Sequence, residues 1–381
     1  MNANIVIIGA GISGTSIAYH LAAKGIKDII VIDKDYLTNG ATGRCGAGIR
    51  QQWATKMNCI MAKKSVEFYE KANQTLGYSH DIEFKQEGYL IVAVTPEEDA
   101  QFTKNVELQN YLGIKSRKIT KEEAKKIVPH INTDMFISAT FCPTDGHINP
   151  FKANDAFYQA AKRLGVTFYF HETVQSIQTD HHRIVGVTTD KRTFQTTKVI
   201  NAAGGFAHEI GLMAGVDIPV YAEKHEILVT EPIEKIQGPM VMSFGKNLYC
   251  QQVPQGSFVM GRGTPDALHN HDITSSWEFL DEMAKTVVSF LPIIGELRVI
   301  RQWAGSYNMS PDRQPILGSV DECDGFYVAC GFSGHGFMFA PITGLLLSEI
   351  IMNEPTTIDM AELCMNRFKN QKTIEVEKSV V

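Results

Sequence analysis

The most constraining feature of the sequence is a glycine-rich turn near the N-terminus, between an apolar run at residues 4–8 and a helical pattern. Gly9, Gly11 and Gly14 have the spacing G-x-G-x-x-G. In a strand–turn–helix unit, the first glycine permits the tight turn, the second lets the backbone approach a pyrophosphate, and the third allows the helix to pack closely on the strand. Asp33 ends the next apolar run, where an acid accepts hydrogen bonds from ribose hydroxyls and disfavours a 2′-phosphate. This arrangement predicts a Rossmann-type unit that binds a dinucleotide.

Two further glycine-rich segments bear on which dinucleotide is bound. Residues 40–50 form a glycine-rich loop, and residues 331–336 precede a second apolar helix expected at 341–351. Glycine-rich backbone suits close approach to an elongated cofactor, and a helix N-terminus can stabilise the negative charge of a reduced flavin. These segments favour FAD. A mobile surface loop at 40–50, and a nicotinamide dinucleotide as the cofactor, stay open as alternatives.

The composition narrows the class of protein and of partner. The 381 residues are 44% hydrophobic with a net charge of −6, which is typical of a globular protein and gives no electrostatic reason to expect a nucleic acid or an anionic membrane as partner. No apolar run approaches the roughly 18 residues of a membrane-spanning helix, and the N-terminus leaves no room for a signal peptide. Seven cysteines occur without a C-x-x-C pair or a metal-ligand spacing, so we expect neither a disulfide framework nor a metal site. We expect a cytoplasmic protein.

The order of periodic segments predicts two interwoven domains. Helices are expected at residues 17–24, 55–76, 96–127, 149–164, 274–291 and 341–351. Residues 220–262 alternate apolar and polar in short runs separated by turns, which is typical of an antiparallel sheet. Since glycine-rich strand–helix junctions occur at the start, in the middle and near the end, we predict a discontinuous cofactor-binding domain and an inserted substrate-binding domain. The predicted ranges are 1–80, 145–219 and 311–381 for the first domain, and 81–144 and 220–310 for the second.

Six segments in family order carry a resemblance to the glycine/D-amino-acid oxidase family of flavoproteins. They are Gly9–Gly14 with Asp33, Gly46–Gln52, Asp145–Pro150, Val199–Gly204, Trp303–Gly305 with Pro311–Asp312, and Gly331–Phe337. Within that family the chain most resembles the branch of the sarcosine oxidase beta-subunit and the proline dehydrogenase beta-subunit. The resemblance implies a mixed α/β fold, in which a Rossmann-type FAD-binding domain carries an inserted substrate domain built on a mainly antiparallel sheet.

The glycine-rich junctions and the resemblance together predict the residues that bind FAD. They are Gly9, Gly11, Ile12, Ser13, Gly14, Asp33, Lys34, Thr42, Arg44, Gly46, Ala47, Gly48, Ile49, Val174, Ala202, Ala203, Gly204, Gly331, Phe332, Gly334, His335, Gly336, Phe337 and Met338. In the monomeric sarcosine oxidases a cysteine carries covalent FAD, but residues 303–311 here contain none. We therefore expect FAD to be bound noncovalently.

The resemblance also implies which residues meet the substrate. It places Arg50 near the flavin, where a planar guanidinium can pair in bidentate fashion with a substrate carboxylate. His225 and Tyr249 are predicted on the sheet of the substrate domain, where either could help to remove a proton from the amine. Trp303 and Met338 are the other predicted substrate-binding residues. A surface arginine and a strand histidine without a catalytic role are the competing interpretations.

Two departures from the monomeric sarcosine oxidases indicate a dehydrogenase. Met338 stands where those enzymes have a carboxylate-binding lysine, and residues 257–261 lack their oxygen-activating lysine. The hypothesis is an FAD-dependent dehydrogenase of a small secondary amino acid (proline, hydroxyproline, sarcosine or an N-substituted glycine). Hydride would pass from the carbon next to nitrogen to flavin N5 and leave an imine, and another subunit would carry a further redox centre. An oxygen-using oxidase of glycine or D-amino acids, and a non-catalytic flavin-binding subunit, are the alternatives.

Overall fold

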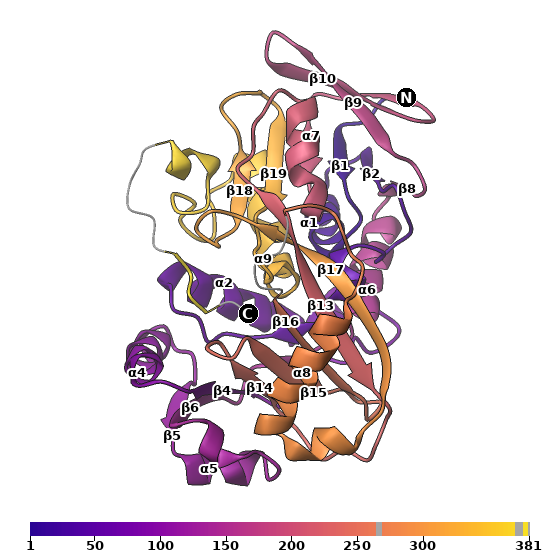
Figure 1. Cartoon of the computed structure of the whole chain (residues 1–381). Helices are drawn as coiled ribbons and strands as arrows, with labels where there is room; N and C mark the ends of the chain where they lie inside the picture. The colour runs from indigo at the N-terminus through magenta and orange to yellow at the C-terminus, as the bar shows by residue number, and fades with distance from the viewer. Residues whose placement is uncertain (264–268, 370–375, 380–381) are drawn as a thin grey trace.

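The computed structural model describes residues 1–263, 269–369 and 376–379, and it contains two large sheets (Figure 1). The first sheet has six strands in the order β18-β19-β12-β1-β2-β8. These strands are β1 (Ile5–Ile8), β2 (Ile29–Ile32), β8 (Thr167–Tyr169), β12 (Val199–Asn201), β18 (Ile316–Ser319) and β19 (Phe326–Cys330). All neighbours are parallel except β18 and β19, which gives the parallel core that the N-terminal motif predicts.

Both faces of the six-stranded sheet are covered, as expected for parallel strands. Ile5 and Ile7 of β1 pack on one face against α1 (Ile12–Ala23) and α9 (Gly336–Ile351). The alternate residues Val6 and Ile8 pack on the other face. That face is covered by α7 (Ala207–Met213) and by a three-stranded sheet of β9 (Val174–Asp180), β10 (Arg183–Thr189) and β11 (Thr193–Gln195).

The second sheet has eight strands in the order β17-β13-β16-β15-β14-β4-β6-β5. They are β4 (Tyr89–Ala93), β5 (Arg117–Ile119), β6 (Ser138–Cys142), β13 (Tyr221–Thr230), β14 (Met240–Ser243), β15 (Leu248–Gln252), β16 (Phe258–Gly263) and β17 (Val299–Met309). Only β4 and β14 pair in parallel, so the prediction of a mainly antiparallel sheet is confirmed. One face packs on α5 (Lys121–Ile127) and α8 (Trp277–Phe290), and the other carries Tyr89, Met240 and Tyr249.

The strands of the two sheets come from different parts of the chain. Every strand of the six-stranded sheet lies within residues 1–80, 145–219 or 311–381, and every strand of the eight-stranded sheet lies within 81–144 or 220–310. The two sheets therefore divide the chain as the sequence pattern does, while the domain boundaries themselves stay predictions.

The predicted helix over residues 96–127 is wrong as a single element. The structure has α4 (Pro96–Tyr111), β5 and α5 in this range. Gly113 has a φ of +79° just after α4, a conformation that glycine adopts readily and that ends a helix. Thr120 and Glu123 then form a capping box, in which each side chain accepts a hydrogen bond from the other residue's backbone N–H, and this starts α5.

The remaining elements are short strands, helices and turns outside the two large sheets. They are α2 (Lys56–Tyr69), α3 (Ala72–Thr75), α6 (Pro150–Arg163), the short strands β3 (Gly48–Ile49) and β7 (Gly146–His147), and the 3₁₀ turns η1 (Ala41–Arg44), η2 (Thr133–Met135), η3 (Gly204–Phe206), η4 (Pro292–Glu296) and η5 (Met365–Phe368). In the part of the chain that the structure describes, none of the helices is long and apolar enough to cross a bilayer.

Candidate active site

The N-terminus of α1 has the geometry that a dinucleotide pyrophosphate requires. Gly11 is the N-cap and offers no side chain, and the first turn of α1 contains no acidic residue. The Thr42 hydroxyl accepts a hydrogen bond from Ile12 N at 3.0 Å, which places the 40–50 loop against this helix end. The positive end of the helix dipole and the close loop backbone together suit a phosphate.

Asp33 lies beside this helix N-terminus at the end of β2. Its carboxylate accepts hydrogen bonds from Ala10 N at 2.7 Å and from Asp35 N at 2.9 Å, so the backbone fixes its orientation. Burial raises the pKa of Asp33, with the two backbone hydrogen bonds acting in the opposite direction. The neighbouring Lys34 points elsewhere, since its Nζ lies 3.3 Å from the ring centre of Phe206.

Four other residues predicted to bind the cofactor lie at two positions around the six-stranded sheet. Ala202, Ala203 and Gly204 follow β12, and a Cβ at Gly9 would meet the Ala202 carbonyl oxygen at 2.4 Å, so this turn lies against the first glycine of the motif. Val174 is buried at the start of β9 in the cluster on the opposite face of the sheet from α1.

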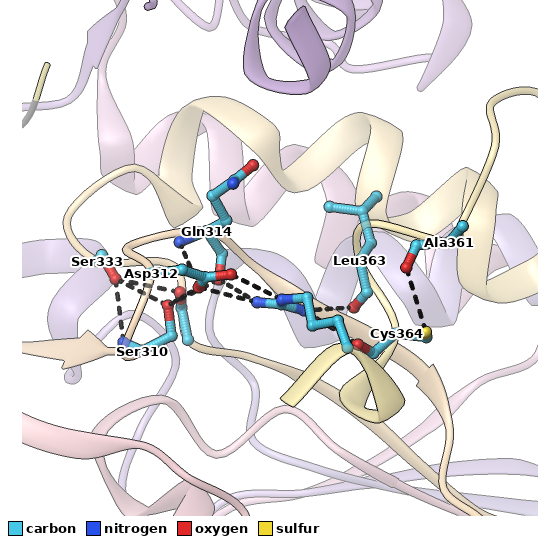
Figure 2. Close-up of polar contacts among 9 residues, drawn as sticks. Ser310, Asp312, Gln314, Ser333, Ala361, Leu363 and Cys364 are labelled. Carbon is cyan, nitrogen blue, oxygen red and sulfur yellow. Dashed lines mark hydrogen bonds and ion pairs between the residues drawn. The ribbon is translucent and has the colours of Figure 1, made fainter. Parts of the chain in front are cut away.

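A second helix N-terminus lies at the loop formed by residues 331–336, from which α9 begins at Gly336. Gly331, Ser333 and Gly334 all have positive φ values, and Ser333 N donates to the Asn308 carbonyl oxygen at 2.8 Å. Ser333 Oγ accepts a hydrogen bond from Ser310 N at 3.1 Å (Figure 2). The loop is thereby fixed to the end of β17.

A cavity lies between this loop, the 40–50 loop and the eight-stranded sheet. Its lining includes residues that the sequence predicts, which are Gly46, Ala47, Gly48, Arg50, Tyr249, Gly334, His335, Phe337 and Met338. It also includes residues that the sequence analysis missed, which are Cys45, Trp53, Tyr89, Met240, Met242 and Tyr307. The wall is mostly aromatic and apolar with a few polar groups, which is typical of a small-molecule site.

Arg50 is the cationic group of the cavity. Its side chain is buried, and its guanidinium carbon lies 3.7 Å from the ring centre of Trp53. Nη1 donates to the Gln52 carbonyl oxygen at 2.9 Å and Nη2 donates to the Ser379 carbonyl oxygen at 2.6 Å. Nε makes no hydrogen bond with the described residues, and no carboxylate among them forms an ion pair with Arg50. Burial lowers the pKa of Arg50, yet a guanidinium stays charged at any working pH.

The polar side chains that line the cavity from the sheet are tyrosines, Tyr89 among them, and not His225. Tyr249 and Tyr307 line it, whereas His225 does not and is 2% exposed. The His225 ring is stacked between them, with its centre 4.2 Å from that of Tyr307, and its Nε2 lies 3.3 Å from the Tyr249 hydroxyl. Burial lowers the pKa of His225 to about 3, so the ring is neutral. The structure thus does not place His225 where it could meet a substrate.

Trp303 also lies outside the cavity lining. Its Nε1 donates to the Arg44 carbonyl oxygen at 3.0 Å, and Arg44 Nη1 donates to the Ala304 carbonyl oxygen at 3.2 Å. These two hydrogen bonds fix η1 to β17. Trp303 therefore holds the predicted cofactor loop and is not in the position of a substrate-binding residue.

His335 and Asp145 lie close to Arg50, and burial shifts the pKa values of both side chains away from their usual range. Burial lowers the pKa of His335 to about 3, and its ring packs 4.7 Å from that of Trp53. Burial raises the pKa of Asp145 to about 6, and its carboxylate accepts hydrogen bonds from Gln51 N at 2.8 Å and Gln52 Nε2 at 3.0 Å. Asp145 thus fixes the backbone that follows Arg50.

Comparison with known proteins agrees with this geometry. The model of the FAD dependent oxidoreductase family, DAO, matches residues 4–350. Sarcosine oxidase subunit beta from Rhodobacter capsulatus is 28% identical, covering 98% of this chain and 90% of that protein. Mitochondrial dimethylglycine dehydrogenase from Rattus norvegicus is 26% identical over 98% of this chain, which spans 46% of that longer protein. The crystal structure of L-proline dehydrogenase from P. horikoshii has a TM-score of 0.92 and 37% identity, covering 97% of this chain and 99% of that one. The chain therefore belongs to the family of FAD-dependent oxidoreductases.

Proposed function

We propose that the chain is an FAD-dependent dehydrogenase that oxidises a small secondary amino acid, of the proline, hydroxyproline, sarcosine or N-substituted glycine type, to an imine. The observation that carries this proposal is the buried guanidinium of Arg50 at the cavity: no carboxylate of the described residues contacts it directly, and those of Glu377 and Asp145 act on its charge only from a distance. A buried charge needs a counter-charge or full hydrogen bonding, and a substrate carboxylate supplies both. FAD, when bound, supplies the two-electron acceptor for the C–H bond next to nitrogen.

The residues that would hold FAD are those at the two helix N-termini. Gly11 and Thr42 would face the pyrophosphate, Asp33 the ribose, and the 331–336 loop the flavin ring. Cys45 is a thiol in the cavity lining, and burial raises its pKa to about 12. Because only a thiolate is an effective nucleophile, this thiol is unsuited to forming a covalent flavin link, which supports noncovalent binding.

The cavity residues suit a substrate with one carboxylate and an apolar body. Arg50 would bind the carboxylate, and the Tyr249 and Tyr307 hydroxyls would donate hydrogen bonds, because burial raises the pKa of both phenols. Met240, Met242, Phe337 and Met338 add an apolar wall against which a pyrrolidine ring or an N-methyl group could pack. With a substrate in place, the same wall would keep water away from the reacting carbon.

Substitution of Gly11 by valine is expected to lower FAD affinity by about 10- to 100-fold, because overpacking a tight contact costs about 1–3 kcal/mol. A Cβ at Gly11 would already lie 3.2 Å from Thr42 Oγ1, and the branched side chain would occupy the space over the helix end. The measurement is fluorescence titration of apoprotein with FAD. Gly238→Val is the matched control, since a Cβ there meets only Glu87 Cβ at 3.8 Å. Equal affinities of the two variants would contradict this assignment.

The pH dependence of catalysis is expected to follow the substrate amine and not His225. Only the neutral amine can lose hydride from the adjacent carbon, so kcat/KM should rise about tenfold per pH unit below the amine pKa. His225 is already neutral there, because burial lowers its pKa to about 3. His225→Gln should leave the bend in the pH profile in place, whereas Tyr249→Phe should lower kcat/KM by about two- to tenfold through loss of one hydrogen bond. A bend that moves in the His225→Gln variant would restore that residue as the base.

The electron acceptor and the cellular setting form part of the same proposal. No lysine lies in the described lining of the cavity, and residues 257–261 contain none, which supports slow reaction with oxygen. One relative is named as a subunit of sarcosine oxidase and one solved structure as a dehydrogenase, which supports a second subunit that takes the electrons onward. The cytoplasm is the setting that we propose for this complex.

Anaerobic titration of the purified flavoprotein tests the function. L-proline, D-proline, trans-hydroxyproline, sarcosine and glycine are added in turn while the visible flavin absorbance is recorded. The expected result is rapid bleaching by one secondary amino acid and slow recovery when air is admitted. Rapid recovery with peroxide release would favour an oxidase. A yellow protein that none of these amines bleaches would favour a non-catalytic flavin-binding subunit.

A further inference from the structure

One of the two carbonyl groups that hold Arg50 comes from the C-terminal end of the chain. Residues 376–379 run beside α2, as the yellow segment in Figure 1 shows. The Ser379 carbonyl oxygen accepts the 2.6 Å hydrogen bond from Arg50 Nη2 across 329 positions of sequence. Ser379 itself is 4% exposed, so this contact is part of the packed interior. The orientation of a cavity residue thus depends on the end of the chain.

Glu377 anchors this segment at the N-terminus of α2. Its side chain is fully buried, and it accepts five hydrogen bonds from neighbouring donors. The donors are Ala54 N, Thr55 N, Thr55 Oγ1, Asn58 Nδ2 and Ser379 N. A carboxylate at a helix N-terminus is stabilised by the free N–H groups and by the helix dipole. Oε2 of Glu377 therefore binds only donors at the start of α2, whereas Oε1 binds both Ala54 N and Ser379 N.

The same segment is joined to the loop at residues 331–336. Glu377 N donates to the Asp312 carbonyl oxygen at 3.1 Å. The Asp312 carboxylate accepts a hydrogen bond from Ser310 Oγ at 3.1 Å, and Ser310 N donates to Ser333 Oγ (Figure 2). The C-terminal segment thus contacts Arg50 directly and is linked to the 331–336 loop through Asp312 and Ser310.

We propose that Glu377 and Ser379 are positioning residues that set the plane of the Arg50 guanidinium for a substrate carboxylate. This inference rests on the proposed function. Bidentate pairing requires the guanidinium and the carboxylate to be nearly coplanar. The carbonyl oxygens of Gln52 and Ser379 fix the plane by taking one hydrogen from each Nη, and they leave three of the five N–H groups for the anion. Selectivity for a free carboxylate over an uncharged group at the same place follows from this arrangement.

A role in stability alone predicts a different result. A carboxylate that only caps α2 would, when removed, weaken the fold and the binding of every ligand alike. A positioning role predicts that binding of a carboxylate ligand is lost while binding of its uncharged analogue is kept. Pyrrole-2-carboxylate and pyrrole-2-carboxamide form such a pair, because their shared aromatic ring has no oxidisable C–H next to nitrogen.

The test uses the full-length, FAD-loaded protein. One variant is Glu377→Gln, and the other is Ser379→Pro, which removes the backbone N–H that donates to the Glu377 carboxylate. Dissociation constants of the two ligands are measured from the change in visible flavin absorbance. The constant for pyrrole-2-carboxylate should rise about 10- to 100-fold in both variants while that for the carboxamide changes less than about threefold, as expected when a binding group is misplaced by about 1 Å. Glu349→Gln is the matched control, since Glu349 is a buried carboxylate that accepts hydrogen bonds from Thr357 near the other end of α9.

Three outcomes separate this inference from the function on which it rests. The expected loss of selectivity in both variants, with Glu349→Gln unchanged, supports the positioning role. Unchanged selectivity in the two variants, alongside its loss in Arg50→Lys, would overturn the positioning role and leave the proposed function intact. If the wild-type protein binds both ligands equally and Arg50→Lys changes neither, the proposed function fails as well. If the Ser379→Pro variant does not fold, the Glu377→Gln variant alone decides between a positioning role and a role in stability.

Discussion

Replacement of Arg50 by alanine is expected to lower kcat/KM for the amino-acid substrate by about thirtyfold to several thousandfold, because losing one partner of a buried charge pair costs about 2–5 kcal/mol or more. The guanidinium lies in the cavity wall over Trp53, with two carbonyl oxygens fixing it and no carboxylate partner among the described residues. The measurement is the rate of anaerobic flavin reduction against substrate concentration, with FAD content determined in parallel.

The control for this prediction separates loss of charge recognition from general damage. Arg117→Ala removes an exposed arginine that pairs with Glu123 at 2.9 Å, and it should leave kcat/KM nearly unchanged. The amide of the same substrate should lose much less than the acid in Arg50→Ala, because it presents no charge to the guanidinium. An equal loss for the acid and for the amide would show that Arg50 does not bind the carboxylate.

The dinucleotide-binding half of the fold could be predicted because its constraints are local. Gly9 has a φ of +108°, which favours glycine, and a Cβ at Gly14 would lie 1.9 Å from the Gly9 carbonyl oxygen. Both requirements are visible in a six-residue motif. Asp33 could be placed for the same reason, since its position at the end of the second strand follows from the order of the strands.

The cavity wall could be predicted only in part because it depends on which face of a strand turns inward. His225 and Tyr249 were both expected to face the substrate. They lie on different strands of the eight-stranded sheet, β13 and β15, and of the two only Tyr249 lines the cavity. The Tyr249 ring lies over Gly261 of the intervening strand, where a Cβ would meet the hydroxyl at 2.3 Å. Tyr307 similarly packs on Gly334, 2.5 Å from the place of a Cβ. Such pairings of tyrosine with glycine join distant segments, so no short motif shows them.

The C-terminal contribution could not be predicted for the same physical reason. Residues 376–379 carry no periodic pattern, and their polar composition favours a frayed end. What holds them is the set of donors that Ala54, Thr55 and Asn58 present to Glu377. The apolar pattern also predicts the last helix over residues 341–351 only, whereas the structure begins α9 at Gly336 and holds Pro341 inside the helix.

The largest expected effect on stability is at the buried ion pair between Asp312 and Arg367. Asp312→Ala should lower the free energy of unfolding by about 3–5 kcal/mol, because it leaves a buried guanidinium without its counter-charge. Arg367 donates to the two carboxylate oxygens at 2.8 and 3.1 Å, and the side chains are 2% and 7% exposed for Asp312 and Arg367. Since Ser310 also donates to Asp312, the substitution should loosen the 331–336 loop as well. Denaturant unfolding at a fixed FAD concentration measures the change, because bound FAD stabilises the folded state.

The companion variants decide whether the charge or the contact carries this stability. Asp281→Ala removes a carboxylate from an exposed pair with Lys285 and should change the free energy of unfolding by less than about 0.5 kcal/mol. The double variant Asp312→Ala with Arg367→Leu should be more stable than Asp312→Ala alone, because no buried charge is left unpaired. If the double variant instead loses the sum of the two single losses, each side chain stabilises the fold through contacts of its own, such as those from Arg367 to the Gln314 and Leu363 carbonyl oxygens.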